Sequence, residues 1–203
     1  MKDLERALRR EAAELPSEPA GLGERLAARA AAEGVLDVAY GWVDSPLGRL
    51  TVAATPRGLV RVAYPFKEPG TVLEELARNV SPRMLEAPER LDDVRRELDE
   101  YFEGRRQEFD LSIDWALTAG FVRSVLRATA RIGYGDVRTY SDMAKAAGSP
   151  RAVRAAGNAL GANPMPVVVP CHRVVRTGGG FGGYTGGIER KEFLLRLEGR
   201  PEV

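Results

Sequence analysis

The chain has 203 residues, and its 44% hydrophobic and 29% charged residues are typical of a globular protein that buries a core. Its length suits one domain or two small ones. The charged N-terminus does not match a signal peptide and no apolar run has membrane-spanning length, so we expect a cytoplasmic protein without membrane contact. The single cysteine excludes an internal disulfide. One cysteine with one histidine cannot make a His/Cys zinc site, so we expect no metal.

Charge is unevenly distributed along the chain. The segment from Trp115 to the C-terminus has 13 Lys and Arg against 6 Asp and Glu, and the preceding segment has 17 against 23. The overall net charge of +1 therefore combines a C-terminal part of +7 with an N-terminal part of −6. A basic part joined to an acidic part indicates that only the C-terminal part meets a polyanion.

The first part of the chain predicts a helical extension followed by a small sheet. Apolar residues at helical spacing predict the extension over residues 1–36. From residue 37 the apolar period changes to two. Tight turns there separate three runs, at 38–43, 50–54 and 59–64, which we expect to form an antiparallel meander.

Helical patterns complete this N-terminal domain, which spans residues 37–114. The apolar spacing predicts helices near 71–79 and 91–102, and alternating polarity at 108–113 predicts one more strand. No group of reactive side chains occurs in the domain. We therefore interpret it as an α+β scaffold.

The remaining residues, 115–203, predict a mostly helical and basic domain. Helical patterns cover about 119–132 and 188–198. Between them, Ser141 is expected to cap one short helix, and Pro150 is expected to lie early in a second. Two short helices joined by a tight turn resemble a helix-turn-helix.

The second short helix, near residues 151–160, combines arginines with very small side chains. Small residues let a helix backbone approach another surface closely, and that surface is either the rest of the protein or a ligand. The flanking arginines and the basic charge of this half favour nucleic acid.

The only cysteine and the only histidine are adjacent, at Cys171 and His172. They follow the β-branched run 167–169, which predicts a buried strand, and Pro170, which lacks a backbone donor. A lone cysteine is usually a small buried hydrophobe. Here a polar triplet ends an apolar run and a glycine-rich loop follows at 177–187. This arrangement is typical of a reactive group at the edge of a pocket.

A cysteine nucleophile reacts as the thiolate, so a base must take its proton. His172 is the only candidate base besides carboxylates. Neighbouring side chains on a strand point to opposite faces, so either Pro170 bends the chain or a water links the thiol to the imidazole. A third group must orient the base, and spacing alone does not choose among Glu189, Glu192 and Glu198.

Six segments, in this order along the chain, resemble the O6-alkylguanine-DNA alkyltransferases, also called methylated-DNA–protein-cysteine methyltransferases. They are residues 135–140, 151–160, 163–164, 170–175, 183–187 and 191–199. The similarity is close over 119–199, loose from residue 38 onward, and nearly absent from 1–35. It implies an α+β fold, with a small antiparallel RNase H-like domain followed by a winged-helix or helix-turn-helix-like DNA-binding domain. It also implies that no cofactor is used.

The resemblance implies a role for each residue of the expected active site. Cys171 accepts the alkyl group, His172 deprotonates it through a bridging water, and Glu198 orients His172. Asn163 stabilises the active-site turn. Tyr140 donates to the purine ring and crowds the neighbouring phosphate, which helps to rotate the base out of the duplex.

The same resemblance implies the contacts with DNA and with the base. The helix near Arg151 enters the minor groove, and Arg154 fills the gap left by the flipped nucleotide. The expected DNA-binding residues are Tyr140, Arg151, Ala152, Arg154, Ala155 and Gly157. The expected substrate-pocket residues are Val174, Tyr184, Thr185, Gly186 and Lys191.

The implied activity is direct-reversal repair of double-stranded DNA. The alkyl group of O6-alkylguanine, and of O4-alkylthymine, moves irreversibly to Cys171. Nothing in the site hydrolyses a thioether, so each molecule acts once. We expect a monomer that is associated with the nucleoid when it acts on DNA.

Two alternative functions compete with repair. The first is a thiol hydrolase that uses Cys171 and His172, although thiol proteases usually carry the histidine far from the cysteine in sequence. The second is a non-catalytic lesion-binding protein of the alkyltransferase-like type. Retention of the cysteine, the histidine and Glu198 argues against the second.

Overall fold

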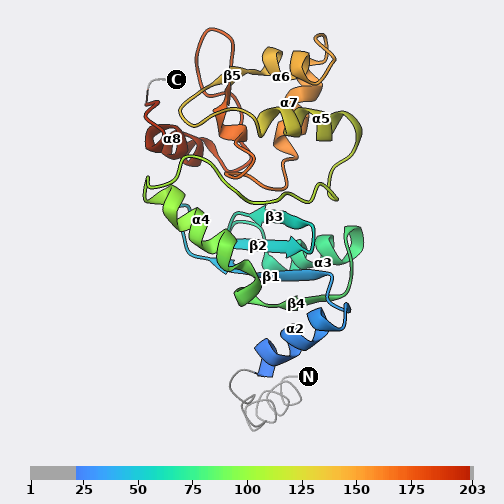
Figure 1. Ribbon diagram of the computed structural model, residues 1–203. Coiled ribbons are helices and arrows are strands. Elements are labelled where there is room, and N and C mark those ends of the chain that lie inside the picture. Colours follow the sequence, from blue (N-terminus) through green and yellow to red (C-terminus); the bar gives the residue numbers. More distant parts are fainter. Residues whose placement is uncertain (1–21, 202–203) are drawn as a thin grey trace, which may run out of the picture.

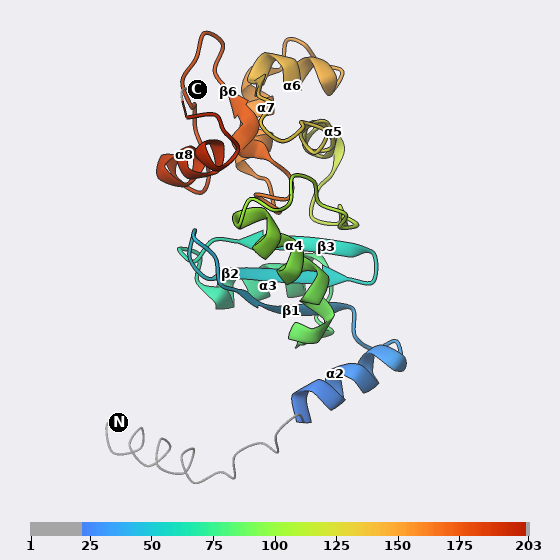
Figure 2. The ribbon, with the colours of Figure 1, turned by 60° about the vertical axis from the view of Figure 1, so that its left-hand side comes forward.

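The computed structural model describes residues 22–201, and the helical prediction for residues 1–21 lies outside the described residues. The N-terminal domain and the C-terminal domain lie one above the other (Figures 1 and 2). Helix α2 (Leu22–Ala32) confirms the second part of the predicted extension. Its Ala27 packs against Ala39 and Ala87 at the edge of the N-terminal domain.

A four-stranded sheet forms the centre of the N-terminal domain. Strands β1 (Val38–Val43), β2 (Leu50–Thr55) and β3 (Gly58–Ala63) pair antiparallel, which confirms the predicted meander. The order is β3-β2-β1-β4, because the short strand β4 (Met84–Glu86) joins β1 in parallel. Three residues are too few to show an apolar period, so the sequence analysis missed β4.

Two helices cover the two faces of this sheet (Figure 1). Both predicted helices are confirmed, as α3 (Pro69–Asn79) and α4 (Asp92–Phe102), and a short 3-10 turn η1 (Pro88–Leu91) precedes α4. Because side chains alternate along a strand, α3 packs on one set of strand residues and α4 on the other. The α4 face is continuous with the core of the C-terminal domain.

The prediction of a strand at 108–113 is wrong. This segment is an extended linker, and within it only Ile113 forms a bridge to the sheet, beside Leu59. Ser112 O accepts from the Leu59 backbone N–H at 2.9 Å. Gly58, with a φ of +129°, allows this approach because a Cβ there would lie 2.2 Å from Ser112 O. The linker therefore pairs with the start of β3 at a single parallel bridge and does not continue as a strand.

The C-terminal domain consists of helices around a two-stranded parallel ladder. The helices are α5 (Gly120–Thr129), α6 (Tyr140–Ala146), α7 (Val153–Gly161) and α8 (Ile188–Leu197), with a 3-10 turn η2 (Cys171–Arg173). The strands are β5 (Arg138–Thr139) and β6 (Val174–Val175). The predicted long helices and the pair of short helices are confirmed. Together the two domains confirm the α+β fold class.

Three local predictions for this domain are corrected. Thr139, not Ser141, caps α6, since its hydroxyl accepts from the Asp142 backbone N–H at 3.1 Å. Helix α7 begins at Val153, so Pro150 lies before the helix. The run 167–169 is buried but forms a turn, with a φ of 75° at Val167. The expected strand comes later, as β6.

The two domains share one core cluster and are joined by the backbone. The Val62 N–H of β3 donates to Pro164 O at 2.9 Å. This bond ties the sheet directly to the loop that leads to Cys171. Within the described part of the chain, no helix is both long enough and apolar enough to cross a bilayer.

Candidate active site

Asn163 and Cys171 meet at the end of a tight loop. The Asn163 side-chain amide donates to Val169 O at 2.8 Å and to Cys171 Sγ at 3.1 Å, and its carbonyl accepts from the Met165 N–H at 3.0 Å. One side chain therefore holds both sides of the loop and contacts the thiol. This explains why the valine run is a turn: the backbone groups that a strand would use are engaged locally.

Cys171 and His172 lie in the 3-10 turn η2, not on a strand. The sequence argument from alternating strand faces therefore does not apply. His172 is fully buried, and its Nε2 lies 2.9 Å from Glu198 Oε1 at the end of α8. Glu189 is exposed and Glu192 pairs with Arg196, so Glu198 is the carboxylate that the fold brings to the imidazole.

Glu198 is surrounded by hydrogen-bond donors. Arg173 binds it with two guanidinium nitrogens, Nε to Oε2 at 2.9 Å and Nη2 to Oε1 at 2.8 Å. The Tyr101 hydroxyl donates to Oε1 at 2.6 Å. Burial raises the pKa of Glu198, but the hydrogen bonds from His172 and Arg173 outweigh it and lower the pKa to about 2. Glu198 is therefore ionised at neutral pH.

An ionised Glu198 determines the tautomer of His172. Since the carboxylate only accepts, Nε2 carries the proton and Nδ1 keeps its lone pair. Nδ1 is buried and has no hydrogen-bond partner among the described residues. Burial lowers the pKa of His172 although Glu198 opposes this, so the imidazole is neutral and can accept a proton.

The thiol of Cys171 is protonated at rest. Burial raises its pKa, while the hydrogen bond from Asn163 and the charge of Lys191 act in the opposite direction. A buried thiol of this kind becomes a nucleophile only when a base takes its proton. The neutral imidazole next to it in sequence is such a base.

Lys191 lies beneath the glycine-rich loop. Its ammonium donates to Val174 O at 2.6 Å and also to Phe181 O. Burial lowers its pKa to about 8. The side chain thus connects β6 to the loop that follows it.

Beside the thiol lies a cavity of about 380 Å³ that is large enough for a nucleobase. It is lined by Tyr140, Gly157, Leu160, Gly161, Cys171, Gly183, Tyr184 and Thr185. The Tyr140 hydroxyl donates to Gly183 O at 3.2 Å, and the Thr185 hydroxyl donates to Gly161 O at 2.7 Å. These two bonds hold the glycine-rich loop against α6 and α7.

Two other predicted pocket residues, Val174 and Gly186, lie outside the cavity beside the thiol. Val174 is fully buried behind the cavity, where its carbonyl accepts from Lys191. Gly186 lies under two aromatic rings, since a Cβ there would be 2.6 Å from Tyr64 Cε2 and 2.7 Å from Tyr184 Cε1. Neither residue lines the cavity beside the thiol.

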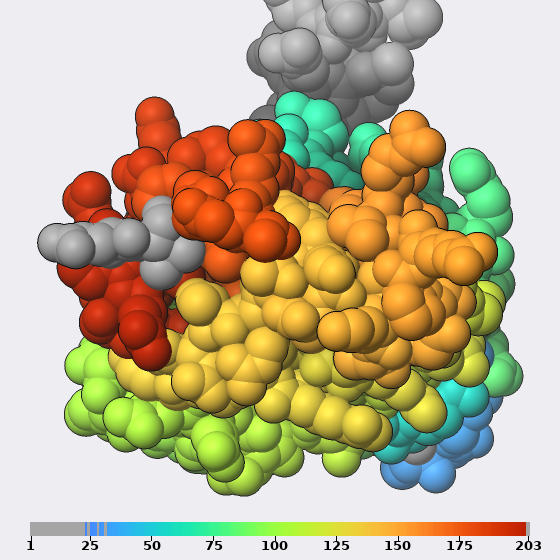
Figure 3. Space-filling model, turned by 90° about the horizontal axis from the view of Figure 1, so that it is seen from above, coloured from blue at the N-terminus to red at the C-terminus, as the bar shows by residue number. Residues whose placement is uncertain are grey.

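The predicted DNA-binding residues lie on α7 and just before it, except Tyr140, which begins α6. Arg151 and Arg154 are exposed, as is Ala155, whereas Ala152 and Gly157 are half-buried. Gly157 faces the Tyr140 ring, which lies 3.7 Å from the position of a Cβ. The segments coloured yellow to orange, which include α6 and α7, cover much of the C-terminal domain as seen from above (Figure 3).

Sequence reasoning missed Leu160, Gly161 and Gly183 of the cavity lining, and it missed three side chains that contact other residues of the site. Arg173 lies within a recognised motif but received no role, and its guanidinium forms a buried ion pair with Glu198 at 2.8 Å. Tyr101 and Tyr64 come from the N-terminal domain, which we interpreted as a scaffold without chemistry. That interpretation is corrected: Tyr101 binds Glu198, and the Tyr64 hydroxyl lies 2.6 Å from the Tyr184 hydroxyl. Apart from the aromatic side chain itself, nothing in the sequence around either tyrosine indicates a role in the site.

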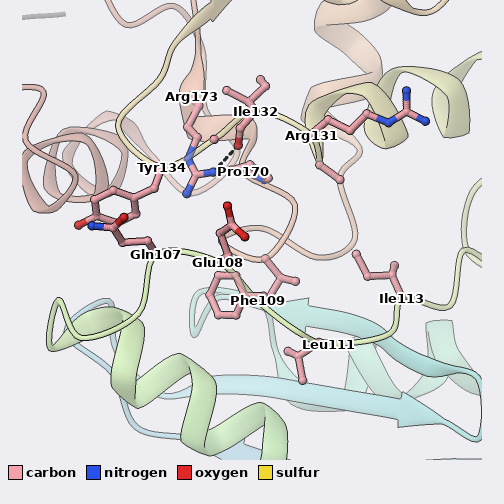
Figure 4. A pocket seen from close by; sticks show the side chains of 13 residues that line it. Gln107, Glu108, Phe109, Leu111, Ile113, Arg131, Ile132, Tyr134, Pro170 and Arg173 are labelled. Atoms are coloured by element: carbon pink, nitrogen blue, oxygen red, sulfur yellow. Dashed lines mark hydrogen bonds between the residues drawn. The ribbon is translucent and has the colours of Figure 1, made fainter.

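A second cavity, of about 280 Å³, lies between the linker and the loop before β5 (Figure 4). Phe109 and Ile113 of the linker face Tyr134 and Arg173 across it. Arg173 donates from Nη1 to Ile132 O here. Cys171 does not line this cavity, so we assign the chemistry to the other one. The described residues contain no group of three His, Cys, Asp or Glu that could hold a metal ion.

Fold and site together define a class of protein in which a buried, base-assisted cysteine lies beside a helix pair of the helix-turn-helix kind. The 6-O-methylguanine DNA methyltransferase family matches this chain with two models. Its ribonuclease-like domain matches residues 38–115 and its DNA-binding domain matches residues 120–200. The chain belongs to this family.

Similar proteins agree with the family. An inducible methylated-DNA–protein-cysteine methyltransferase of Bacillus subtilis is 42% identical over 151 residues, which is 73% of this chain and 83% of the relative. A methylated-DNA–protein-cysteine methyltransferase of Methanosarcina barkeri is 36% identical over 78% of this chain and 96% of the relative. A crystal structure of Mycobacterium tuberculosis OGT in complex with DNA is 35% identical, with a TM-score of 0.68 over 79% of this chain and 92% of that one.

Proposed function

We propose that the protein repairs alkylated DNA by direct reversal, as a methylated-DNA–protein-cysteine methyltransferase with Cys171 as the acceptor. The observation that carries the proposal is the position of Cys171 Sγ. It lines a nucleobase-sized cavity and is followed directly by a neutral imidazole bound to an ionised carboxylate. The names of the relatives agree with this activity.

The transfer step uses groups that are already in place. The proton of the Cys171 thiol passes through a water to His172 Nδ1, the buried ring nitrogen without a partner among the described residues. The sulfur attacks the alkyl carbon, so a C–S bond forms while the C–O6 bond breaks and its electron pair stays on guanine. Glu198 stabilises the imidazolium that forms. Tyr140, whose hydroxyl donates to Gly183 O in the free protein, would donate to the purine ring instead and so offset the charge on the leaving base.

The product explains why each molecule acts once. A thioether carbon is unactivated, and the site offers no group that would displace it again. Lys191 is engaged by two carbonyl groups, and Glu198 is engaged by Arg173 and Tyr101. The acceptor is therefore consumed, and O4-alkylthymine would consume it by the same step.

DNA is expected to reach the site across α7. The damaged nucleotide must leave the duplex to reach a buried thiol. The small exposed or half-buried residues Ala152, Ala155 and Gly157 let α7 enter the minor groove closely, while Arg151 contacts the backbone. Arg154 would occupy the space of the extruded base. In this proposal the protein acts as a monomer, in the compartment that holds the DNA.

Mass spectrometry tests the proposal directly. The full chain is incubated with a duplex containing one O6-methylguanine and is then digested. The peptide with Cys171 should gain the mass of one CH2, in an amount equal to the protein and no more. Cys171→Ser is the matched control and should gain nothing.

The same experiment separates the alternatives. An unmodified Cys171 peptide despite tight binding of the damaged duplex would indicate a lesion-binding protein without transfer. Repeated turnover of a thioester or p-nitrophenyl ester, lost in Cys171→Ser, would indicate a thiol hydrolase. Either result would overturn the proposed function.

A further inference from the structure

Cys171 borders two spaces, not one. The first is the nucleobase-sized cavity on the α7 side. The second is a hollow of only about 30 Å³ on the side of the N-terminal domain. Its lining includes Tyr64, Asn163, Pro166 and Cys171, and it shares Tyr184 and Thr185 with the larger cavity. The thiol thus lies between a large space and a small one.

Tyr64, which follows β3, forms a rigid wall of the small hollow. It is 3% exposed, and its hydroxyl lies 2.6 Å from that of Tyr184. Phe66 stacks on its ring at 5.8 Å, and the Arg190 guanidinium lies 5.3 Å from the ring centroid.

Arg190, one neighbour of Tyr64, is itself anchored. Arg190 donates to Gly186 O at 2.9 Å and to Leu47 O at 3.2 Å, and these two hydrogen bonds fix its guanidinium beside the Tyr64 ring. The Tyr64 ring also leaves no room for a Cβ at Gly186, where the distance would be 2.6 Å. The ring is therefore fixed by contacts on its faces, its edge and its hydroxyl.

We propose that Tyr64, a residue of the N-terminal domain, sets an upper limit on the size of the alkyl group that Cys171 accepts. This inference rests on the proposed function. In a displacement reaction the sulfur, the transferred carbon and O6 lie nearly in line. Any further carbon atoms of the alkyl group must then project sideways, beside Sγ. With guanine in the larger cavity, the space left beside Sγ is the small hollow.

The volume of the hollow decides which alkyl groups fit. A methyl group places its only carbon on the line between sulfur and O6 and needs no extra room. An ethyl group adds one carbon, for which about 30 Å³ suffices. A benzyl group adds a phenyl ring, and a protein cavity that binds benzene has roughly 150 Å³. The wild-type site should therefore favour methyl and ethyl over benzyl.

The test compares second-order rate constants for one duplex that carries O6-methylguanine, O6-ethylguanine or O6-benzylguanine at the same position. Because a benzylic carbon is intrinsically the more reactive, the reference is the methyl-to-benzyl ratio for a small thiolate in solution. The wild-type chain should exceed that ratio by at least about tenfold, the size of a one-group steric discrimination. This measurement needs no variant, so it remains decisive if a substitution at buried Tyr64 prevents folding.

Three substitutions locate the limit at Tyr64. Tyr64→Leu and Tyr64→Ala should raise the ratio of benzyl to methyl rate constants by about tenfold or more. Tyr64→Phe keeps the ring and should change the ratio less than about twofold. Tyr40→Leu is the matched control, because Tyr40 lies in the same sheet and packs in the cluster beneath α3. It should leave the ratio unchanged.

The outcomes separate this inference from the function on which it rests. A methyl-to-benzyl ratio in the wild-type chain no larger than that of the small thiolate would overturn the size limit and leave repair intact. A folded Tyr64→Leu or Tyr64→Ala variant with active methyl transfer and an unchanged ratio would overturn the role of Tyr64. A wild-type chain that does not react with O6-methylguanine would overturn the proposed function, and the size limit with it.

Discussion

Tyr101 on α4 donates its hydroxyl proton to Glu198 Oε1 at 2.6 Å, across the boundary between the two domains. Tyr101 is fully buried, and the same carboxylate oxygen lies 2.9 Å from His172 Nε2. Burial and the charge of Glu198 raise the pKa of Tyr101 well above its usual value, so it remains a donor. The N-terminal domain thus participates in the arrangement that sets the basicity of the histidine.

Removing this hydroxyl should shift the pH dependence of alkyl transfer. In Tyr101→Phe, Glu198 loses one donor and interacts more strongly with His172, so the pKa of His172 should rise toward its usual value. Transfer requires the neutral imidazole, so the midpoint of the pH–rate profile should move to higher pH. Loss of a hydrogen bond to a charged group should also lower the free energy of unfolding by about 1.5–3 kcal/mol. Single-turnover rates from pH 5 to 9 and urea unfolding provide the two measurements.

Tyr134→Phe is the matched control for Tyr101→Phe. The Tyr134 hydroxyl donates to Leu197 O at 2.8 Å, one residue before Glu198, and does not contact the carboxylate. Its removal should lower stability by about 1 kcal/mol and leave the pH midpoint unchanged. A Tyr101→Phe profile that superimposes on the profile of this control would mean that Tyr101 only packs.

Glu198 should make stability depend on pH in the acid range. Its pKa is about 2 in the folded chain, against a usual value of 4.5, so the folded state favours the ionised form. The resulting stabilisation, about 3 kcal/mol, is complete above pH 5 and is lost as the pH falls from about 4.5 toward 2. Glu198→Gln cannot titrate there. The difference in free energy of unfolding between wild type and Glu198→Gln should therefore shrink as the pH falls.

Glu192→Gln serves as the control, because it removes a partly exposed carboxylate of the same helix. The difference in free energy of unfolding between Glu192→Gln and the wild type should stay nearly constant over the same pH range. If the free energies of unfolding of the wild type and Glu198→Gln followed parallel curves between pH 5 and pH 2, the assignment of an ionised, multiply bonded Glu198 would be contradicted.

Local patterns predicted the parts of this structure that local forces determine. The period of two predicted β1 to β3, and the period of 3.6 predicted α3, α4 and α5. The valine run before Pro170 was mispredicted because its conformation depends on the Asn163 side chain, which bonds Val169 O six residues away. A β-branched run carries no sign of such a partner.

The active site also has one part that local sequence patterns predicted and one part that they did not. The motifs around Cys171, His172 and Asn163 lie close together in sequence and were recognisable there. Tyr64 and Tyr101 were not, because their partners Tyr184 and Glu198 are 120 and 97 residues away. Such contacts follow from how the two domains dock, and a single sequence does not encode that docking in any local pattern.

Arg154 should matter for duplex DNA and not for the chemical step. Its side chain is exposed near the start of α7 and is absent from the lining of the thiol cavity. Arg154→Ala should slow repair of a duplex containing O6-methylguanine by at least about tenfold, because the extruded base is no longer replaced. The slow reaction with free O6-methylguanine base should be unaffected. Arg78→Ala, an exposed arginine on α3, is the control, and equal losses with duplex and free base would contradict the role of Arg154.

Binding to DNA should weaken steeply with salt. The C-terminal part carries 13 Lys and Arg against 6 Asp and Glu, so phosphate contacts should release counterions. Even two such contacts predict about a tenfold loss of affinity between 50 and 200 mM salt, and more contacts predict a larger loss. Fluorescence anisotropy with an undamaged duplex and the Cys171→Ser variant measures this without alkyl transfer. Reaction with the free base should not change over the same range, since it needs no phosphate contact. An affinity for DNA that does not change with salt concentration would show that the basic charge of this domain does not face the DNA backbone.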